Sequence, residues 1–236
     1  MKIIAKREAI LSPLQAVIGV VERRQTMPIL ANVLLSAKGG RLAVTATDLE
    51  VELVATSEVD VQRNGEVTVP GRKLLDICRA LPEGAEITLT LDGERMSVRA
   101  RKSRFTLSTL PASEFPTVDE INAQQALKVP QKDFKRLLEK THFSMAQQDV
   151  RYYLNGLLLE TSAKALRTVA TDGHRLALCE VDLPQGAKSG QQVIVPRKGV
   201  LELQRILGNE DQILEIAIGT NHVRVQIGDI RFTSKL

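Results

Sequence analysis

The sequence predicts an α+β protein built from two copies of one domain, and three observations lead to that prediction. Residues 67–81 align with residues 193–207, 126 positions further along the chain. Apolar residues recur at helical spacing in four segments, two in each half of the chain. Short strand-like runs lie between these segments, without the strand–helix–strand alternation of a parallel sheet. We therefore expect each copy to pack two helices on antiparallel sheets.

Two shorter matches support the internal repeat. Residues 46–48 recur at 170–172, and residues 104–106 recur at 231–233, so the offsets are 124 and 127 positions. A period of this length is the size of a whole domain, and two domains fit a chain of 236 residues. We expect a first domain at 1–118 and a second at 127–236. A linker is expected at about 111–126, a polar stretch with two prolines.

The first copy is predicted to contain helices within 6–24 and 71–81. Apolar residues from Ile10 to Val21 define the first helix, and Pro70-Gly71 opens the second. Two dipeptides, Gly39-Gly40 and Asp92-Gly93, predict hairpin turns. The strands of this copy are expected at 33–37, 42–47, 51–57, 67–69, 87–91, 95–99 and 105–108.

The second copy repeats this order. Its helices are predicted within 131–142 and 196–207, the second preceded by Pro196. Its strands are expected at 157–160, 166–171, 176–180, 214–218, 222–225 and 230–233. Each copy is thus expected to consist of two successive units, and each unit has the order strand, helix and three strands.

Composition indicates an ordinary globular protein. Hydrophobic residues make up 43% of the chain but aromatic residues only 3%, so aliphatic side chains must build the cores. No apolar run is long enough to span a membrane, and the first residues lack the apolar stretch of a signal peptide. Cys78 and Cys179 lie at non-equivalent positions of the two copies. We interpret them as buried reduced thiols of a cytoplasmic protein.

Basic residues are concentrated in the four predicted helical segments. These segments contain fourteen basic and six acidic residues, a net charge of +8 in a chain whose total is +4. Solvated helix faces would explain the lysines and arginines, but glutamate favours helices equally and is scarce here. A positive helical face suits a polyanion, of which DNA is the first candidate. No recognition helix or zinc finger is evident, so we expect phosphate contacts that are indifferent to sequence.

The chain shows no pattern typical of an enzyme. His142, His174 and His222 have neither the spacing of a catalytic triad nor that of a metal site. Asp172 and His174 could form a base and its orienting group, but such a short pair is more often a turn. We expect no catalytic activity, no metal and no cofactor.

Five segments resemble the bacterial DNA polymerase III beta subunit, the replicative sliding clamp. They lie at 81–84, 103–111, 143–156, 168–177 and 193–200, and the similarity covers the whole chain. The resemblance implies the DNA-clamp fold: a ring of six such domains, with helices facing the hole and sheets outside. It also implies a non-catalytic processivity factor that encircles duplex DNA and tethers the polymerase.

The resemblance places DNA contacts at loops and helix starts. The implied residues are Arg24, Gln148, Tyr152 and Tyr153 in loops and Arg72, Lys73, Arg197 and Lys198 at helix starts. For each basic residue the alternative is a solvated helix end. For Tyr152-Tyr153 the alternative is core packing of at least one ring, because neighbours in a strand face opposite ways.

Two protein-binding surfaces follow from the same resemblance. A groove for short linear motifs of polymerases and the clamp loader is implied at Leu154, Thr171, Gly173, His174, Arg175 and Leu176. The alternative is that both leucines are core and that 172–173 is an ordinary turn. An edge for self-association into a ring is implied at Ile77, Leu81, Phe105 and Leu107, with core burial as its alternative.

The main departure from the family is length. A family chain has three copies of the domain, and two chains close the ring, whereas this chain contains two copies. We favour a truncated clamp that lacks the third domain and with it part of the motif groove. The other possibility is that three copies of this chain close six domains. The competing function is a non-topological DNA-binding or scaffold protein that reuses the clamp domain.

Overall fold

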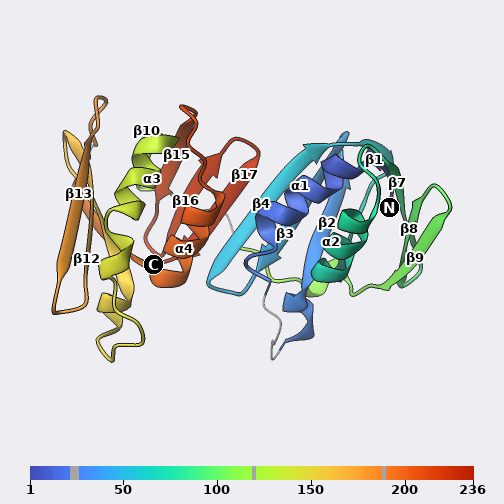
Figure 1. The fold of residues 1–236 in the computed structure, drawn as a ribbon, viewed down its shortest axis with the longest axis horizontal. Coiled ribbons are helices and arrows are strands. Elements are labelled where there is room, and N and C mark those ends of the chain that lie inside the picture. Colours follow the sequence, from blue (N-terminus) through green and yellow to red (C-terminus); the bar gives the residue numbers. More distant parts are fainter. Residues whose placement is uncertain (22–26, 119–120, 188–189) are drawn as a thin grey trace. The chain divides into compact units, whose positions relative to one another are not determined.

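The computed structural model describes residues 1–236 except 22–26, 119–120 and 188–189. The chain divides into two compact units, Met1–Val118 and Asp119–Leu236, which we call unit 1 and unit 2. Each unit packs two α-helices on antiparallel sheets (Figure 1). The α+β prediction is therefore confirmed.

The described residues of unit 1 form two α-helices, α1 (Arg7–Val17) and α2 (Gly71–Ala80), and nine strands. The strands are β1 (Lys2–Lys6), β2 (Asn32–Lys38), β3 (Arg41–Thr47), β4 (Val51–Glu58), β5 (Asp60–Arg63), β6 (Gly65–Pro70), β7 (Glu86–Asp92), β8 (Arg95–Ala100) and β9 (Ser103–Ser108). Two short 3-10 helices, η1 (Pro28–Ala31) and η2 (Ala112–Glu114), complete it.

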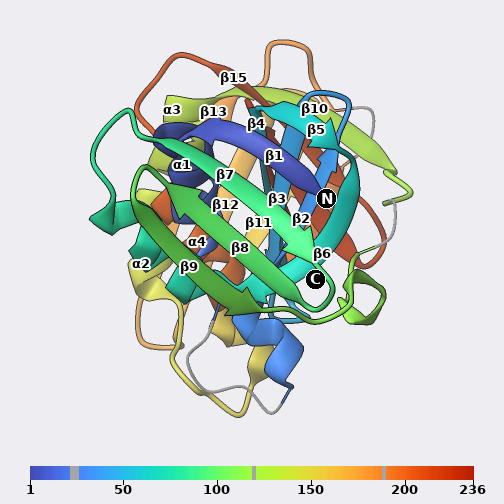
Figure 2. The ribbon, with the colours of Figure 1, turned by 90° about the vertical axis from the view of Figure 1, so that its right-hand side faces the viewer.

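The strands of unit 1 form two antiparallel layers. One is the five-stranded sheet β5-β1-β7-β8-β9, seen face on in Figure 2, with β9 at its edge. The other has the order β4-β3-β2-β6, with Thr45 facing Val54 across β3 and β4. Helix α1 packs on β3 and β4, and α2 lies beside α1. The two helices thus cover one side of the second layer.

Unit 2 repeats this arrangement with helices α3 (Gln131–Glu139) and α4 (Arg197–Ile206). Its strands are β10 (Gln125–Pro130), β11 (Gly156–Thr161), β12 (Ala165–Thr171), β13 (Leu176–Asp182), β14 (Gln191–Pro196), β15 (Ile213–Ile218), β16 (His222–Ile227) and β17 (Ile230–Lys235). One layer has the order β10-β15-β16-β17 and the other β13-β12-β11-β14. Two 3-10 helices, η3 (His142–Ser144) and η4 (Tyr152–Asn155), connect α3 to β11.

Aliphatic side chains fill both units, as the composition predicts. Leu35, Leu42 and Leu74 in unit 1 and Leu214 in unit 2 are fully buried. Burial of such side chains contributes about 1.5–3 kcal/mol each to stability. A smaller cluster in unit 1 joins Phe115 to Ile29, Leu30 and Leu34. The first residues of the predicted linker therefore pack on unit 1, and its last two residues, 125–126, begin β10.

The elements differ from prediction at the ends of the repeats. Strands β1, β5, β10 and β14 were not predicted, because each is short and carries exposed charged or polar residues among its apolar ones. The helix predicted within 6–24 ends at Val17, so α1 contains only one arginine and one glutamate. The four helices together hold ten basic and five acidic residues. Their net charge is thus +5 and not +8, and α1 contributes none of it.

The two cysteines occupy different environments. Cys78 is buried in α2, and burial raises the pKa of its thiol to about 12. Cys179 in β13 is only half-buried, so the expectation of two buried thiols is wrong for this residue. Among the described residues, none of the helices has the length and apolar character needed to cross a bilayer.

Candidate nucleic-acid and partner interface

A loop between α3 and β11 carries three of the predicted DNA contacts. We call residues 145–155 the tyrosine loop. Asn155 closes it, because its Nδ2 donates to the Asp149 carbonyl at 2.8 Å while its Oδ1 accepts from the Asp149 N–H at 2.9 Å. The Ala146 N–H also donates to the Leu154 carbonyl at 2.9 Å. The loop is thus fixed by its own hydrogen bonds.

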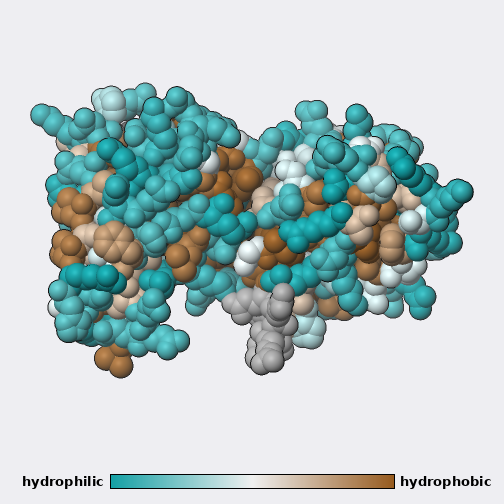
Figure 3. All heavy atoms as spheres, viewed as in Figure 1, coloured by the Kyte–Doolittle hydropathy of each residue, from teal (hydrophilic) through white to brown (hydrophobic). Residues whose placement is uncertain are grey.

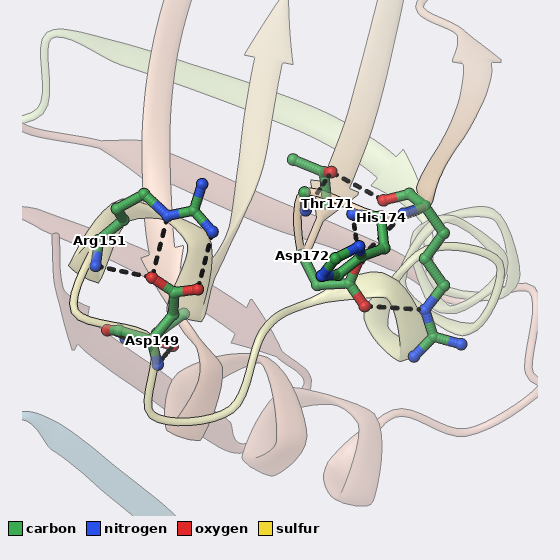
Figure 4. Close-up of polar contacts among 8 residues, drawn as sticks. Asp149, Arg151, Thr171, Asp172 and His174 are labelled. Atoms are coloured by element: carbon green, nitrogen blue, oxygen red, sulfur yellow. Dashed lines mark hydrogen bonds and ion pairs between the residues drawn. The ribbon is translucent and has the colours of Figure 1, made fainter.

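An ion pair inside the tyrosine loop orients Arg151. Asp149 Oδ1 accepts from Arg151 Nε at 3.0 Å and from its backbone N–H at 2.8 Å, and Oδ2 accepts from Nη2 at 2.9 Å (Figure 4). Hydrogen bonds from the Arg151 guanidinium, and then from its backbone, lower the pKa of Asp149 to about 2. A two-point contact of this kind sets both the position and the plane of a guanidinium.

The predicted DNA residues of this loop are exposed. Gln148 is exposed, and its φ of 58° lies in the left-handed region that few residues other than glycine adopt. The side chains of Tyr152 and Tyr153 are 83% and 51% exposed, and their rings meet edge to face at 6.0 Å. The alternative that one ring lies in the core is wrong, because both residues belong to the 3-10 helix η4 and not to a strand.

The helix starts hold the predicted basic residues near their neighbouring loops. In unit 2, Arg197 Nη1 donates to the Met145 carbonyl at 3.4 Å, so the start of α4 lies beside the tyrosine loop. In unit 1, Arg72 Nη2 donates to the Val21 carbonyl at 2.5 Å. Lys73 is exposed and Lys198 is half-buried. The predicted contact Arg24 lies outside the described residues.

The predicted motif groove is centred on a tight turn between β12 and β13, which we call the 171–176 turn. Thr171 Oγ1 donates to the Arg175 carbonyl at 2.7 Å and accepts from the Gly173 N–H. Asp172 Oδ1 accepts from the backbone N–H groups of His174 and Arg175 at 3.0 Å each. These two hydrogen bonds lower the pKa of Asp172, and the bond from the Arg175 backbone has the larger effect. Asp172 thus contacts the backbone of His174 as a turn residue does.

Arg175 connects this turn to the segment after α3. Its Nη2 donates to the Phe143 carbonyl at 2.7 Å, and its guanidinium carbon lies 5.8 Å from the centre of the Phe143 ring. Beyond it, the Leu176 side chain is 64% exposed, whereas Leu154 is buried. The core alternative therefore applies to Leu154 and not to Leu176.

The tyrosine loop and the 171–176 turn lie against each other. A Cβ placed on Gly173 would be only 3.3 Å from Arg151 Nη2, so the guanidinium lies directly over this glycine. Gly173 has a φ of +88°, a conformation that favours glycine. The tyrosine loop and the 171–176 turn are therefore neighbours in unit 2, and Figure 4 shows Asp149 and Arg151 of the loop with Thr171, Asp172 and His174 of the turn.

Sequence reasoning missed the residues that organise this surface. Asp149, Arg151, Asn155 and Phe143 were not chosen, although all four lie in the stretch 143–156 that carries the resemblance. The spacing of Asp149 and Arg151 is the available signal, because an Asp side chain readily accepts from the backbone N–H two residues on. The reciprocal contact of Asn155 depends on the loop's path and has no such signal.

The predicted ring edge is only partly exposed. Phe105 on the edge strand β9 is 37% exposed, and Ile77 on α2 is half-buried. Leu81 and Leu107 are buried within unit 1. Phe105 is therefore the member of this set that offers most apolar surface. No cluster of three or more metal-binding side chains occurs within the described part of the chain.

Two copies of one α+β unit, each with two helices packed on antiparallel sheets and a basic second helix, define the class of protein as a two-domain α+β repeat. The protein family described as "DNA polymerase III beta subunit, N-terminal domain" matches residues 1–119. The family described as "DNA polymerase III beta subunit, central domain" matches residues 128–236. Together they cover most of the chain. The chain belongs to the DNA polymerase III beta subunit family, the family of the bacterial sliding clamps.

Relatives with established names agree with this assignment. The chain is 54% identical to the beta sliding clamp of Escherichia coli over 237 aligned residues, covering 100% of this chain and 64% of that protein. It is 53% identical to that of Pseudomonas putida, covering 98% and 63%. A crystal structure of the DNA polymerase III subunit beta from Pseudomonas aeruginosa matches with a TM-score of 0.97 at 51% identity, covering 100% and 64%. The chain thus spans just under two thirds of the length of these relatives.

Proposed function

We propose that this protein acts as a processivity clamp for a DNA polymerase. In this function it encircles duplex DNA, slides along it without reading the sequence, and holds the polymerase near the primer end. Tethering raises the effective concentration of the polymerase at its substrate. The proposal includes a non-catalytic role, a cytoplasmic location and no cofactor.

The charge of the second helices is the observation that carries the proposal. Helices α2 and α4 each have a net charge of +2, and each opens near two consecutive basic residues, Arg72-Lys73 and Arg197-Lys198. Lysines and arginines at helix starts suit phosphates, which attract a protein to DNA without fixing its position along the sequence. A clamp needs this combination, because it must be attracted to DNA and must also move along it without preferring any base sequence.

The surface around the 171–176 turn supports binding of short linear motifs from polymerases and clamp-loader proteins. The exposed Leu176 offers an apolar contact, and Arg175 and the backbone of the turn offer hydrogen-bonding groups beside it. Apolar anchors next to a few polar groups suit an extended peptide. The third-domain part of the groove lies in the portion of the relatives that this chain does not span.

Ring formation is the remaining part of the proposal. The edge made by β9 and α2, with Ile77, Leu81, Phe105 and Leu107, would contact a neighbouring clamp unit. Exposed strand edges are ready templates for pairing with another chain. The alternative function, a DNA-binding scaffold that never encloses DNA, would need the basic helices but not this edge.

Binding of the 236-residue chain to short duplexes tests the phosphate contacts. We expect affinity to be equal for unrelated sequences and to fall steeply with salt. Substituting Lys73→Gln should reduce the salt slope by about 1, since one phosphate contact is lost. The matched control is Lys128→Gln on β10, where the lysine pairs with Glu215 at 3.4 Å and the slope should not change. Equal slopes for both variants, or a strong sequence preference, would contradict the proposal.

A further inference from the structure

Two asparagines of the chain are followed by glycine, Asn64-Gly65 in unit 1 and Asn155-Gly156 in unit 2. This pair of residues can rearrange, because glycine has no side chain to hinder attack of its backbone nitrogen on the preceding side-chain amide. The attack gives a cyclic imide and ammonia, and water then opens the imide to aspartate or isoaspartate. In a folded protein the reaction requires an asparagine side chain that is free to turn toward the next backbone nitrogen.

The side chain of Asn155 is held at both ends of its amide. Its Nδ2 donates to the Asp149 carbonyl at 2.8 Å, and its Oδ1 accepts from the Asp149 N–H at 2.9 Å. Gly156 is buried and faces Pro196 in the neighbouring strand β14. The amide carbon of Asn155 therefore cannot turn toward the Gly156 nitrogen without losing both hydrogen bonds.

The exposure of the surrounding loop does not account for this protection. Val150, in the tyrosine loop that Asn155 ends, is 96% exposed. Figure 3 shows a hydrophobic residue that projects at the lower tip of unit 2, where Figure 1 draws this loop. Water thus reaches the tyrosine loop, and the two hydrogen bonds of Asn155 are what restrain its side chain.

The side chain of Asn64 has no such restraint. Asn64 is exposed and lies in the short connection between β5 and β6. The two side chains before it have partners, because Gln62 Nε2 donates to Asp60 Oδ2 at 2.7 Å and Arg63 Nη2 donates to the Leu91 carbonyl at 3.1 Å. Within the described part of the chain, the Asn64 amide makes no hydrogen bond. It is therefore free to turn toward the Gly65 nitrogen.

The fold requires glycine at position 65. Its φ of 157° is one that other residues rarely adopt, and a Cβ placed there would lie only 3.0 Å from the Met1 Cβ. Gly65 is also the first residue of β6 and pairs with Ala37 at the end of the ladder with β2. Strand ends open more readily than strand centres. The reactive pair thus occupies an exposed position at the end of a strand.

We propose that Asn64 is a site of spontaneous deamidation in the folded protein and that Asn155 is protected. The Gly65 nitrogen loses its proton and attacks Cγ of Asn64. The bond from Cγ to the side-chain nitrogen breaks, and that nitrogen takes up the proton and leaves as ammonia. Water then adds to either carbonyl of the imide and gives aspartate or isoaspartate. The product lowers the net charge of +4 by one unit, and isoaspartate adds one backbone carbon directly before β6.

Peptide mapping of the 236-residue chain after incubation at mildly alkaline pH tests this assignment. Cleavage after lysine gives the peptides 39–73 and 141–164, each of which contains a single asparagine. Mass spectrometry should find acid accumulating at Asn64, with conversion at Asn155 slower by about tenfold or more because two hydrogen bonds must break first. Asn64→Gln should abolish the change in 39–73 and leave 141–164 unaltered, since its longer side chain would have to close a less favourable ring.

The same chain unfolded in urea is the matched control. Both asparagines are then unrestrained, so they should convert at similar rates. Equal rates in the folded protein, or faster conversion at Asn155, would overturn the proposal. It would also be overturned if Asn64 remained an amide in the folded protein for the time that it takes to convert in urea. Because neither measurement uses DNA or a partner, the outcome is independent of the proposed clamp function.

Discussion

At the scale of single residues, the surface proposed to meet DNA and partner peptides depends on Asp149. Its carboxylate holds the guanidinium of Arg151 at two points, and that guanidinium lies over Gly173 in the neighbouring turn. Tyr152 and Tyr153 follow directly in the chain. Asp149 therefore acts as a positioning residue for the tyrosine loop and, through Arg151, for the 171–176 turn.

The ion pair predicts an unusual pH dependence of the tyrosine loop. The pKa of Asp149 is depressed in the folded protein, so its contribution to stability is present above the ordinary pKa of 3.8 and is lost as pH falls through about 2. We expect NMR signals of residues 149–153 to stay constant from pH 7 to 4 and to shift with a midpoint near 2. In Arg151→Gln the midpoint should move toward 3.8. A wild-type midpoint near 4 would contradict this geometry.

A substitution in the neighbouring turn tests the contact between the two loops. Gly173→Ala introduces a side chain at a φ of +88° and beside the Arg151 guanidinium. The strained backbone alone should lower the free energy of unfolding by roughly 1–2 kcal/mol. Thermal unfolding measures this loss. The control is Gly84→Ala, because Gly84 also has a positive φ but has open space around it. This change should lower the free energy of unfolding through backbone strain and should not shift the NMR signals of residues 149–153.

At the scale of elements, sequence periodicity predicted both second helices and most strands, because their apolar residues alternate or recur as burial requires. It placed the end of the first helix too late, since Val20 and Val21 continue the apolar spacing beyond Val17 and are buried outside the helix. It also missed β1, whose ends are lysines. The tyrosines were misplaced because the sequence does not reveal the 3-10 turn η4.

The repeated second helices allow a matched test of core packing. Leu75 in α2 and Leu201 in α4 occupy aligned positions, yet Leu75 is buried and Leu201 is exposed. Leu75→Ala should lower the free energy of unfolding by about 2–5 kcal/mol because it leaves a cavity. Leu201→Ala should change it by less than about 1 kcal/mol. Urea denaturation compares the two, and similar losses would mean that the two helices present the same face to their cores.

At the scale of the whole molecule, the repeat matters more than any single site. The net positive charge resides in α2, α3 and α4, the rest of the chain is almost neutral, and the exposed strand edges include β9 and β13. These features suit a protein that works by enclosing its substrate. The repeat and the charge could be recognised in the sequence. The exposure of β13 could not, because its leucines resemble those of any buried strand.

Retention on circular DNA tests the central claim most directly. The chain would be assembled with a nicked circular plasmid and then passed through a sizing column at a salt concentration that releases ordinary phosphate contacts. We predict that protein remains with the circle and is lost when the same plasmid is cut once before the column. Equal retention on both forms, or equal loss from both as salt rises, would contradict a clamp and favour a DNA-binding scaffold.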